Sequence, residues 1–140
     1  MSKIAVIYWS GTGNTEIMAN SVLEGIKSSG ADAELFTAGE FDVSTAENFD
    51  AIAFGCPAMG AETLEESEFQ PMWDLVENKI KGKKIGLFGS YGWGDGEWMR
   101  NWEESAKNSG AELISESVIC NNEPDDEALE KCRNLGKALV

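Results

Sequence analysis

The stretch Ser10-Gly11-Thr12-Gly13-Asn14-Thr15 follows an apolar run at residues 4–9 and precedes a helical pattern that begins near Glu16. A strand, a glycine-rich turn and a helix in this order can form an anion site, because the first amides of a helix have no acceptor within it. The glycines let the backbone approach a ligand, and the hydroxyl and amide side chains add neutral donors. The turn therefore predicts a phosphate-binding loop, the alternative being a turn whose polar residues only cap the helix.

Composition favours a single small acidic domain that covers residues 1–140. Eleven Lys and Arg against 25 Asp and Glu give a net charge of −14. Such a chain repels nucleic acid and anionic membranes, so neither is an expected partner, and a basic protein surface is. No apolar run approaches the ~20 residues that span a bilayer. The first residues lead directly into a predicted strand without a signal peptide, so we expect the cytoplasm.

Cysteine and histidine usage restricts the possible chemistry. Cys56, Cys120 and Cys132 form no CxxC pair and no metal spacing, and histidine is absent. These facts exclude Ser-His and Cys-His nucleophiles and histidine metal sites, and they indicate reduced thiols. Cys56 borders a predicted loop of the site; of a redox-active thiol and a small residue at a strand end, we favour the second. The chemistry is therefore expected from a bound cofactor.

Apolar patterning predicts strands that alternate with helices. The expected strands cover residues 3–9, 31–36, 50–55, 84–89 and 113–120, and the expected helices cover 14–29, 69–78, 97–109 and 124–139, with one helical turn within 37–48. Alternation of this kind gives an α/β fold with three layers, a five-stranded parallel sheet with helices on both faces. The common strand order is 2-1-3-4-5.

Three loops are expected at the carboxyl edge of this sheet, near the switch point between the first and third strands. They are residues 10–15, 56–62 and 90–96. Ligands of such folds bind at that point, outside the carboxyl ends of the strands. We therefore expect the three loops to share one ligand.

The second and third loops supply partners for a flat ring. Met59 brings a thioether beside the flexible Gly60 and the carboxylate of Glu62, and Trp93 stands between glycines. Thioethers and indoles both pack well on π systems, so Met59 and Trp93 can cover the two faces of one ring. Taken singly, the alternatives are a core methionine, a tryptophan that anchors its loop and a solvated charge.

The loop sequences closely resemble those of the flavodoxins over essentially the whole chain. The resemblance is carried by Tyr8-Trp9-Ser10-Gly11-Thr12-Gly13-Asn14-Thr15, by Gly55-Cys56-Pro57-Ala58-Met59-Gly60, by Leu87-Phe88-Gly89-Ser90-Tyr91-Gly92-Trp93-Gly94-Asp95-Gly96 and by Asn122-Glu123-Pro124-Asp125. The chain looks like the short-chain, clostridial type, because nothing interrupts the predicted fifth strand. Flavodoxin is itself an example of strand order 2-1-3-4-5, so that expectation is not independent of the resemblance.

The resemblance implies a tightly but non-covalently bound FMN. Its phosphate would meet the first loop, its ring would lie between Met59 and Trp93, and its N3–H would donate to Glu62. The Met59–Gly60 peptide would flip on reduction. Two departures from the family pattern are Pro57, where some relatives carry a hydroxyl, and Ala61, where a polar residue is common. The implied FMN-binding residues are Ser10, Gly11, Thr12, Gly13, Asn14, Thr15, Pro57, Ala58, Met59, Gly60, Glu62, Ser90, Tyr91, Gly92, Trp93, Gly94 and Asn122.

The implied function is that of a non-enzymatic, low-potential one-electron carrier that uses the semiquinone/hydroquinone couple and can replace ferredoxin. The implied protein is a monomer whose partners are basic-surfaced oxidoreductases such as pyruvate oxidoreductase, hydrogenase or NADP reductase. The alternatives are an FMN-dependent NAD(P)H reductase of the same fold and a flavin-free phosphate-binding or signalling domain. The signalling alternative lacks the acidic residues of a receiver domain, and a triphosphatase would need a Walker lysine.

Charge placement predicts a dipolar molecule that is acidic around the cofactor. The lysines expected at the far edge of the sheet are Lys3, Lys27, Lys79, Lys81, Lys83, Lys84, Lys107 and Lys137. The acids expected near the site are Glu62, Glu65, Glu66, Glu68, Asp95 and Glu97. This arrangement opposes addition of an electron to the ring and steers basic partners toward it.

Overall fold

The computed structural model describes residues 2–140 and confirms the alternation of strands and helices. The strands are β1 (Lys3–Tyr8), β2 (Asp32–Thr37), β3 (Ala51–Gly55), β4 (Lys84–Tyr91), β5 (Glu112–Leu113) and β6 (Val118–Asn121). The α-helices are α1 (Asn14–Ser28), α2 (Phe69–Val76), α3 (Glu97–Asn108) and α4 (Asp126–Leu139), with 3-10 turns η1 (Val43–Asn48) and η2 (Glu77–Lys79). The turn expected within residues 37–48 is η1.

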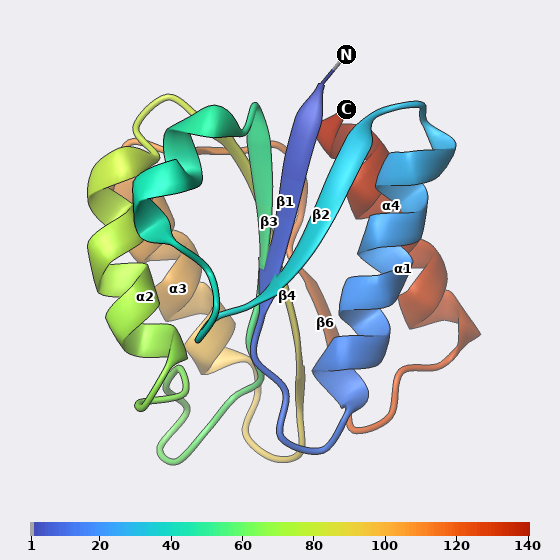
Figure 1. The fold of residues 1–140 in the computed structure, drawn as a ribbon. Helices are drawn as coiled ribbons and strands as arrows, with labels where there is room; N and C mark the ends of the chain where they lie inside the picture. Colours follow the sequence, from blue (N-terminus) through green and yellow to red (C-terminus); the bar gives the residue numbers. More distant parts are fainter. Residues whose placement is uncertain (1) are drawn as a thin grey trace.

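All strand pairs are parallel, and the order β2-β1-β3-β4-β5 is the predicted one. Helices α1 and α4 cover one face of the sheet and α2 and α3 the other, which gives three layers (Figure 1). The strands all run toward the same edge, the lower one in Figure 1, where the loops after β1, β3 and β4 lie together. Among the helices of residues 2–140, none is long and apolar enough to cross a bilayer.

The fifth strand differs from the prediction. Instead of one strand over residues 113–120, β5 and β6 each pair with β4, and residues 114–117 separate them. Ser115, Glu116 and Ser117 supply no apolar side chain for the sheet, and the Ser117 hydroxyl instead donates to Glu103 of α3 at 2.7 Å. The interruption is short, so the resemblance to the short-chain type stands.

Strand β4 runs two residues further than predicted, and Ser90 and Tyr91 belong to it. They pair with Cys120 and Asn121 of β6, a partner that patterning within residues 84–96 does not reveal. The third loop therefore begins at Gly92. This extension carries the backbone of β4 into the wall of the site described below.

Each face of the sheet has its own core. The α2–α3 face is aromatic, and the rings of Phe54, Trp73 and Trp102 meet edge to face at 5.1 and 5.7 Å between centroids. On the other face α1 and α4 cross closely, because a Cβ on Gly136 would lie 2.2 Å from the Val22 carbonyl oxygen. Tight packing on both faces fixes the ends of the helices at the loop edge.

Candidate functional site

The loops after β1, β3 and β4 surround one hollow of about 210 Å³ at the carboxyl edge of the sheet. Its lining consists of Trp9, Ser10, Gly11, Thr12, Asn14, Thr15, Pro57, Ala58, Met59, Ser90, Tyr91, Gly92 and Asn122. The predicted residues that this lining does not include are Gly13, Gly60, Glu62, Trp93 and Gly94, of which Glu62 lines a separate hollow with Trp98 and Trp102. The structure thus brings together most of the predicted set, from segments far apart in the sequence.

The first loop is shaped by its own hydrogen bonds. Gly13 precedes α1 in the left-handed region, at φ 98°. The Ser10 hydroxyl oxygen accepts from the amides of Gly13 and Glu16 at 3.1 and 3.3 Å. The first helical amides, at Asn14 and Thr15, have no acceptor within α1 and lie at the hollow. The loop is therefore built to receive an acceptor-rich group such as a phosphate.

Thr15 also joins the first loop to β4. It is buried, and its hydroxyl lies 3.2 Å from the hydroxyl of Ser90, which is buried as well. Either oxygen can donate in this pair. The contact ties the turn after β1 to the last residues of β4 and holds two walls of the hollow at a fixed separation.

The second loop closes on itself as a tight turn. The backbones of Met59 and Thr63 exchange hydrogen bonds of 2.8 Å in both directions, and Gly60 and Glu62 both have positive φ, 48° and 56°. A Cβ on Gly60 would meet only the Thr63 hydroxyl, at 3.9 Å. The Ala58 amide donates to the Ser90 carbonyl at 3.1 Å, so this loop too is anchored on β4.

In the third loop Trp93 is 51% exposed, directly after Gly92 of the hollow wall. Asn122 completes this side. It has φ 59°, its amide donates to the Tyr91 carbonyl at 2.7 Å, and its side-chain oxygen lies 3.4 Å from where a Cβ on Gly92 would be. Any side chain larger than glycine at position 92 would project toward Asn122 and narrow the hollow.

Trp9 lines the hollow but is not among the FMN-binding residues expected from the sequence. Its ring lies 3.0 Å from the position of a Cβ on Gly11, so the glycine makes room for the indole. Trp9 is the last residue of the apolar run and directly precedes Ser10. This position could have indicated a site residue, because side chains at the carboxyl end of a central strand lie at the edge where ligands bind.

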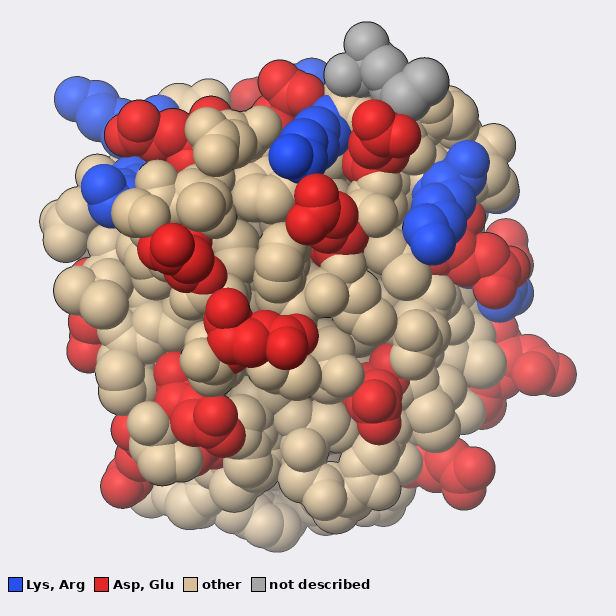
Figure 2. All heavy atoms as spheres, in the orientation of Figure 1, with Lys and Arg blue, Asp and Glu red and all other residues tan. Residues whose placement is uncertain are grey.

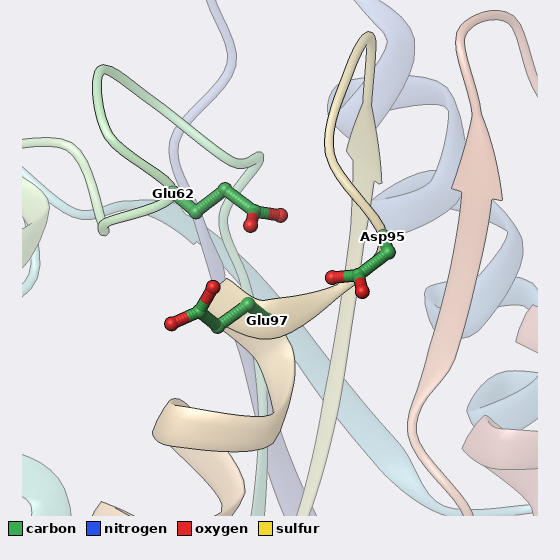
Figure 3. A group of neighbouring side chains, drawn as sticks. All are labelled: Glu62, Asp95 and Glu97. Atoms are coloured by element: carbon green, nitrogen blue, oxygen red, sulfur yellow. The ribbon is translucent and has the colours of Figure 1, made fainter.

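Three carboxylates gather beside the second and third loops. Oxygen atoms of Glu62, Asp95 and Glu97 all lie within 4.8 Å of one another. In Figure 3 the side chains of Glu62 and Asp95 point toward each other from two loops, and Glu97 stands at the start of α3. Asp95 also pairs with Arg100 at 3.0 Å. The group gives this rim of the site a concentrated negative charge.

Glu62 keeps one free acceptor beside the third loop. Its Oε1 is buried and has no hydrogen-bond partner among the described residues, and it lies 2.2 Å from where a Cβ on Gly94 would be. A buried oxygen without a donor costs about 1–3 kcal/mol or more. An N–H brought to this point by a ligand would therefore be bound favourably.

Glu65 is not the surface charge that the sequence suggested. It is only 6% exposed, and its carboxylate accepts from the amides of Ser67, Glu68 and Phe69 at 2.8, 2.8 and 2.9 Å, at the start of α2. Burial alone raises the pKa of Glu65, but the hydrogen bonds from Ser67, Phe69 and Glu68 outweigh it and lower the pKa. Glu65 is a helix-capping residue.

The thiol next to the site is enclosed by its surroundings. Cys56 is fully buried, and the Glu65 amide donates to its sulfur at 3.4 Å. Burial raises the pKa of Cys56 to about 12. Because the thiolate is the reactive form, this supports the interpretation as a small residue at a strand end.

One part of the predicted charge separation, that of the cations, is visible on the face drawn in Figure 2, whereas acidic side chains lie over both halves of it. In Figure 2 lysine and arginine side chains lie in the upper half of this face, and the lower half, toward the loops, carries only acidic and uncharged residues. The elements explain this, since Lys3 and Lys84 begin strands and Lys27, Lys107 and Lys137 stand at helix ends. Arg100 is a cation near the loops that the prediction did not include.

A glycine-rich turn at a helix N-terminus, placed at the switch point of a doubly wound parallel sheet, is typical of α/β proteins that bind nucleotides. The flavodoxin profile matches residues 6–136. The chain is 46% identical to a flavodoxin of Clostridium beijerinckii, with 96% of this chain and 97% of that one covered, and 46% identical to one of Megasphaera elsdenii, with 98% of each covered. The chain belongs to the flavodoxin family.

Solved structures agree with this assignment. The solution structure of two-electron reduced Megasphaera elsdenii flavodoxin has a TM-score of 0.89, with 45% identity and 97% of each chain covered. A flavodoxin from the domain Archaea has a TM-score of 0.85, with 26% identity, and covers 98% of this chain and 95% of that one. Family membership implies a flavin cofactor, for which FMN is the usual one, and a role in electron transfer.

The residues present fit FMN. Hydroxyls and helical amides in the lining suit its phosphate, and Met59 in the lining suits its ring. The exposed Trp93 and the unpaired oxygen of Glu62 stand on the adjoining loops. No Lys or Arg lines the hollow. The phosphate would therefore be held by neutral donors.

Proposed function

We propose that this protein is a low-potential one-electron carrier that uses non-covalently bound FMN and, like ferredoxin, passes electrons between larger oxidoreductases. The single observation that carries the proposal is the convergence of three loops on one hollow, whose lining contains the hydroxyls of the first loop together with Met59 of the second. When bound, FMN supplies two one-electron steps. The chain supplies the binding site and the electrostatic setting.

The residues have distinct roles in this proposal. The loop from Ser10 to Thr15 holds the phosphate through hydroxyls and helical amides. Met59 and Trp93 cover the ring and exclude water from its faces. Glu62 accepts from the ring N–H, and its charge, with that of Glu97, opposes a further negative charge on the ring. Space at Gly60 permits the Met59–Gly60 peptide to turn, but the turn breaks the hydrogen bonds that the Met59 carbonyl accepts from the amide and hydroxyl of Thr63 at 2.8 and 3.2 Å.

The proposed partners are oxidoreductases with basic surfaces, such as pyruvate oxidoreductase, hydrogenase or NADP reductase. The acidic rim beside Trp93 supports this, because complementary charge steers association. We further propose that residues 1–140 act as one FMN-binding unit, as a monomer, in the cytoplasm. The three free cysteines are consistent with a reducing compartment.

Stepwise anaerobic reduction of the FMN-loaded protein, followed by visible spectroscopy and electron paramagnetic resonance, tests this function. The proposal expects two resolved one-electron steps, the second at a strongly negative potential. A single two-electron step would contradict the carrier function. Steady oxidation of NADH or NADPH by the protein alone would favour the reductase instead, and a protein that ignores added FMN would favour a flavin-free domain.

A further inference from the structure

Trp98 connects the second loop to α3, although it does not line the hollow proposed for FMN. It is the second residue of α3 and lies on the buried face of that helix with Trp102 and Ala106. Its side chain is only 2% exposed, and its indole Nε1–H donates to the carbonyl oxygen of Cys56 at 3.1 Å. Since Cys56 begins the second loop, one side chain joins that loop to the helix that follows the third.

The polar groups of Cys56 are held by three different segments. Its amide donates to the Phe88 carbonyl at 3.1 Å, its sulfur accepts from the Glu65 amide at 3.4 Å, and its carbonyl accepts from Trp98. The peptide that follows has no N–H, because its nitrogen belongs to Pro57. The carbonyl is therefore the one hydrogen-bonding group of that planar peptide, and the indole fixes the orientation of the plane.

The orientation of this peptide is passed on to Met59. Pro57 has a fixed φ, and the amide of Ala58 donates to the Ser90 carbonyl at 3.1 Å, so little freedom remains between Cys56 and Met59. Residues 57–59 all line the hollow. A displaced Cys56 carbonyl would therefore displace the wall that carries the thioether.

The packing around Trp98 makes room for the bond. A Cβ on Gly89 would overlap the Cys56 carbonyl oxygen and lie 3.2 Å from Trp98 Cζ2, so glycine at this place on β4 admits both groups. The Trp98 ring also packs against Tyr91, which lines the hollow, with 5.4 Å between centroids. The indole thus touches the wall that β4 provides and binds the start of the wall that the second loop provides.

We propose that Trp98 is a positioning residue of the flavin site, whose indole N–H holds the second loop at the separation from the third loop that a flavin ring requires. The inference rests on the proposed function, since it takes the ring to lie between Met59 and Trp93. Trp98 acts through Cys56 and Tyr91. Loss of its N–H should therefore weaken binding of the ring and leave the phosphate loop unchanged.

Trp98→Phe keeps an aromatic ring against Tyr91 and removes the N–H. Titrations that follow flavin fluorescence should show at least tenfold weaker binding of FMN and a loss of the same size for riboflavin, which has the ring without the phosphate. Trp73→Phe is the matched control, because Trp73 is 1% exposed and its indole also donates at 3.1 Å, to the Ser105 hydroxyl. It should change neither affinity more than twofold.

A second variant displaces the carbonyl without altering the indole. Gly89→Ala places a methyl group where the Cys56 carbonyl oxygen lies, and it should weaken FMN and riboflavin in the same way. Unchanged FMN affinity in Trp98→Phe, an equal loss in Trp73→Phe, or a loss for FMN without one for riboflavin would overturn the proposal.

Hydrogen exchange of the FMN-free full chain gives a readout that needs no flavin. In Trp98→Phe the amides of Ala58 and Met59, both hydrogen-bonded in the second loop, should exchange at least tenfold faster, whereas Trp73→Phe should leave their rates unchanged. Wild-type rates at both amides of Trp98→Phe would overturn the proposal even if FMN binds. If the wild type ignored FMN, the electron-carrier function would fail, and faster exchange would still show that Trp98 positions the second loop.

Discussion

Trp93 has half its side chain exposed between two glycines, and nothing in the fold accounts for so large an apolar surface at this place. Burying an aromatic ring against a ligand is favourable by more than its area alone. The exposed ring is therefore available to cover one side of the proposed FMN.

Trp93→Ala should weaken FMN binding at least tenfold and change the unfolding free energy of the FMN-free chain by less than about 0.5 kcal/mol, because the side chain is exposed. Fluorescence titration and urea unfolding measure the two effects. Leu75→Ala on α2, where the side chain is 61% exposed, is the control and should leave both unchanged. Equal FMN affinity in Trp93→Ala would remove Trp93 from the site.

The three thiols should differ in reactivity in the native protein. Burial raises the pKa of Cys56 and Cys132 to about 12 and that of Cys120 to about 11. At pH 8 the thiolate fraction of Cys120 is therefore about 100-fold below that of a free thiol. A thiol reagent should modify Cys120 slowly, the two others only after unfolding. Rapid loss of Cys56 in the folded chain would contradict this order.

The roles of single residues can be predicted where their partners are neighbours in the sequence. They cannot be predicted where the partners are far apart in the sequence. The turn from Ser10 to Thr15 is readable because its glycines and hydroxyls are contiguous. The pairing of Thr15 with Ser90 is not, because the partners are 75 positions apart. Glu65 reads as one acid in an acidic run, and only the fold shows that it is buried.

At the scale of elements, α2 begins where Glu65 accepts from three backbone amides. A carboxylate at a helix N-terminus satisfies donors that have no partner in the helix and complements its dipole. The same residue donates its own amide to Cys56, so the cap also anchors the second loop to the end of β3.

Glu65→Gln should lower the unfolding free energy by about 1–3 kcal/mol, because its NH2 group cannot accept the bonds that Ser67 donates to one oxygen and its remaining oxygen accepts without a charge. The pKa of Glu65 is lowered in the folded state, so its contribution is complete above pH 4.5 and is lost as the pH falls through the folded value. Urea unfolding at pH 7 and pH 3 should show the difference between wild type and variant shrink at pH 3. Glu66→Gln, an exposed neighbour, is the control.

Element type and order could be predicted from the sequence because each strand and helix carries its own periodicity. The carboxyl end of β4 and the interruption between β5 and β6 could not be predicted. Both depend on pairing between residues about 30 positions apart, such as Ser90 with Cys120. The apolar pattern within a short segment does not indicate which distant strand it pairs with.

On the face drawn in Figure 2 the cations lie away from the loops, and the acids Glu62, Asp95 and Glu97 gather beside the second and third loops. A unit charge about 10 Å from the ring, at an effective dielectric constant near 40, contributes about 0.8 kcal/mol. For a one-electron step that is about 35 mV before screening by salt. The placement of charges around the site therefore affects the redox potential of the bound FMN.

Opposite charge changes at this rim should shift the potential of the second electron in opposite directions. Glu97→Gln should raise it by about 35 mV and Arg100→Gln should lower it by a similar amount, because one variant removes a negative and the other a positive charge. Redox titration at low salt measures both. Glu34→Gln, on β2 where it pairs with Lys3, is the remote control and should have no effect. Shifts of the same sign in both rim variants would refute the electrostatic account.

Structure determination of the protein with bound FMN tests the central claim most directly. The account predicts one FMN, with its phosphate on the amides and hydroxyls of Ser10 to Thr15, its ring between Met59 and Trp93, and its ring N–H on Glu62. FMN bound elsewhere, or bound at this edge with its ring away from Met59 and Trp93, would contradict the claim.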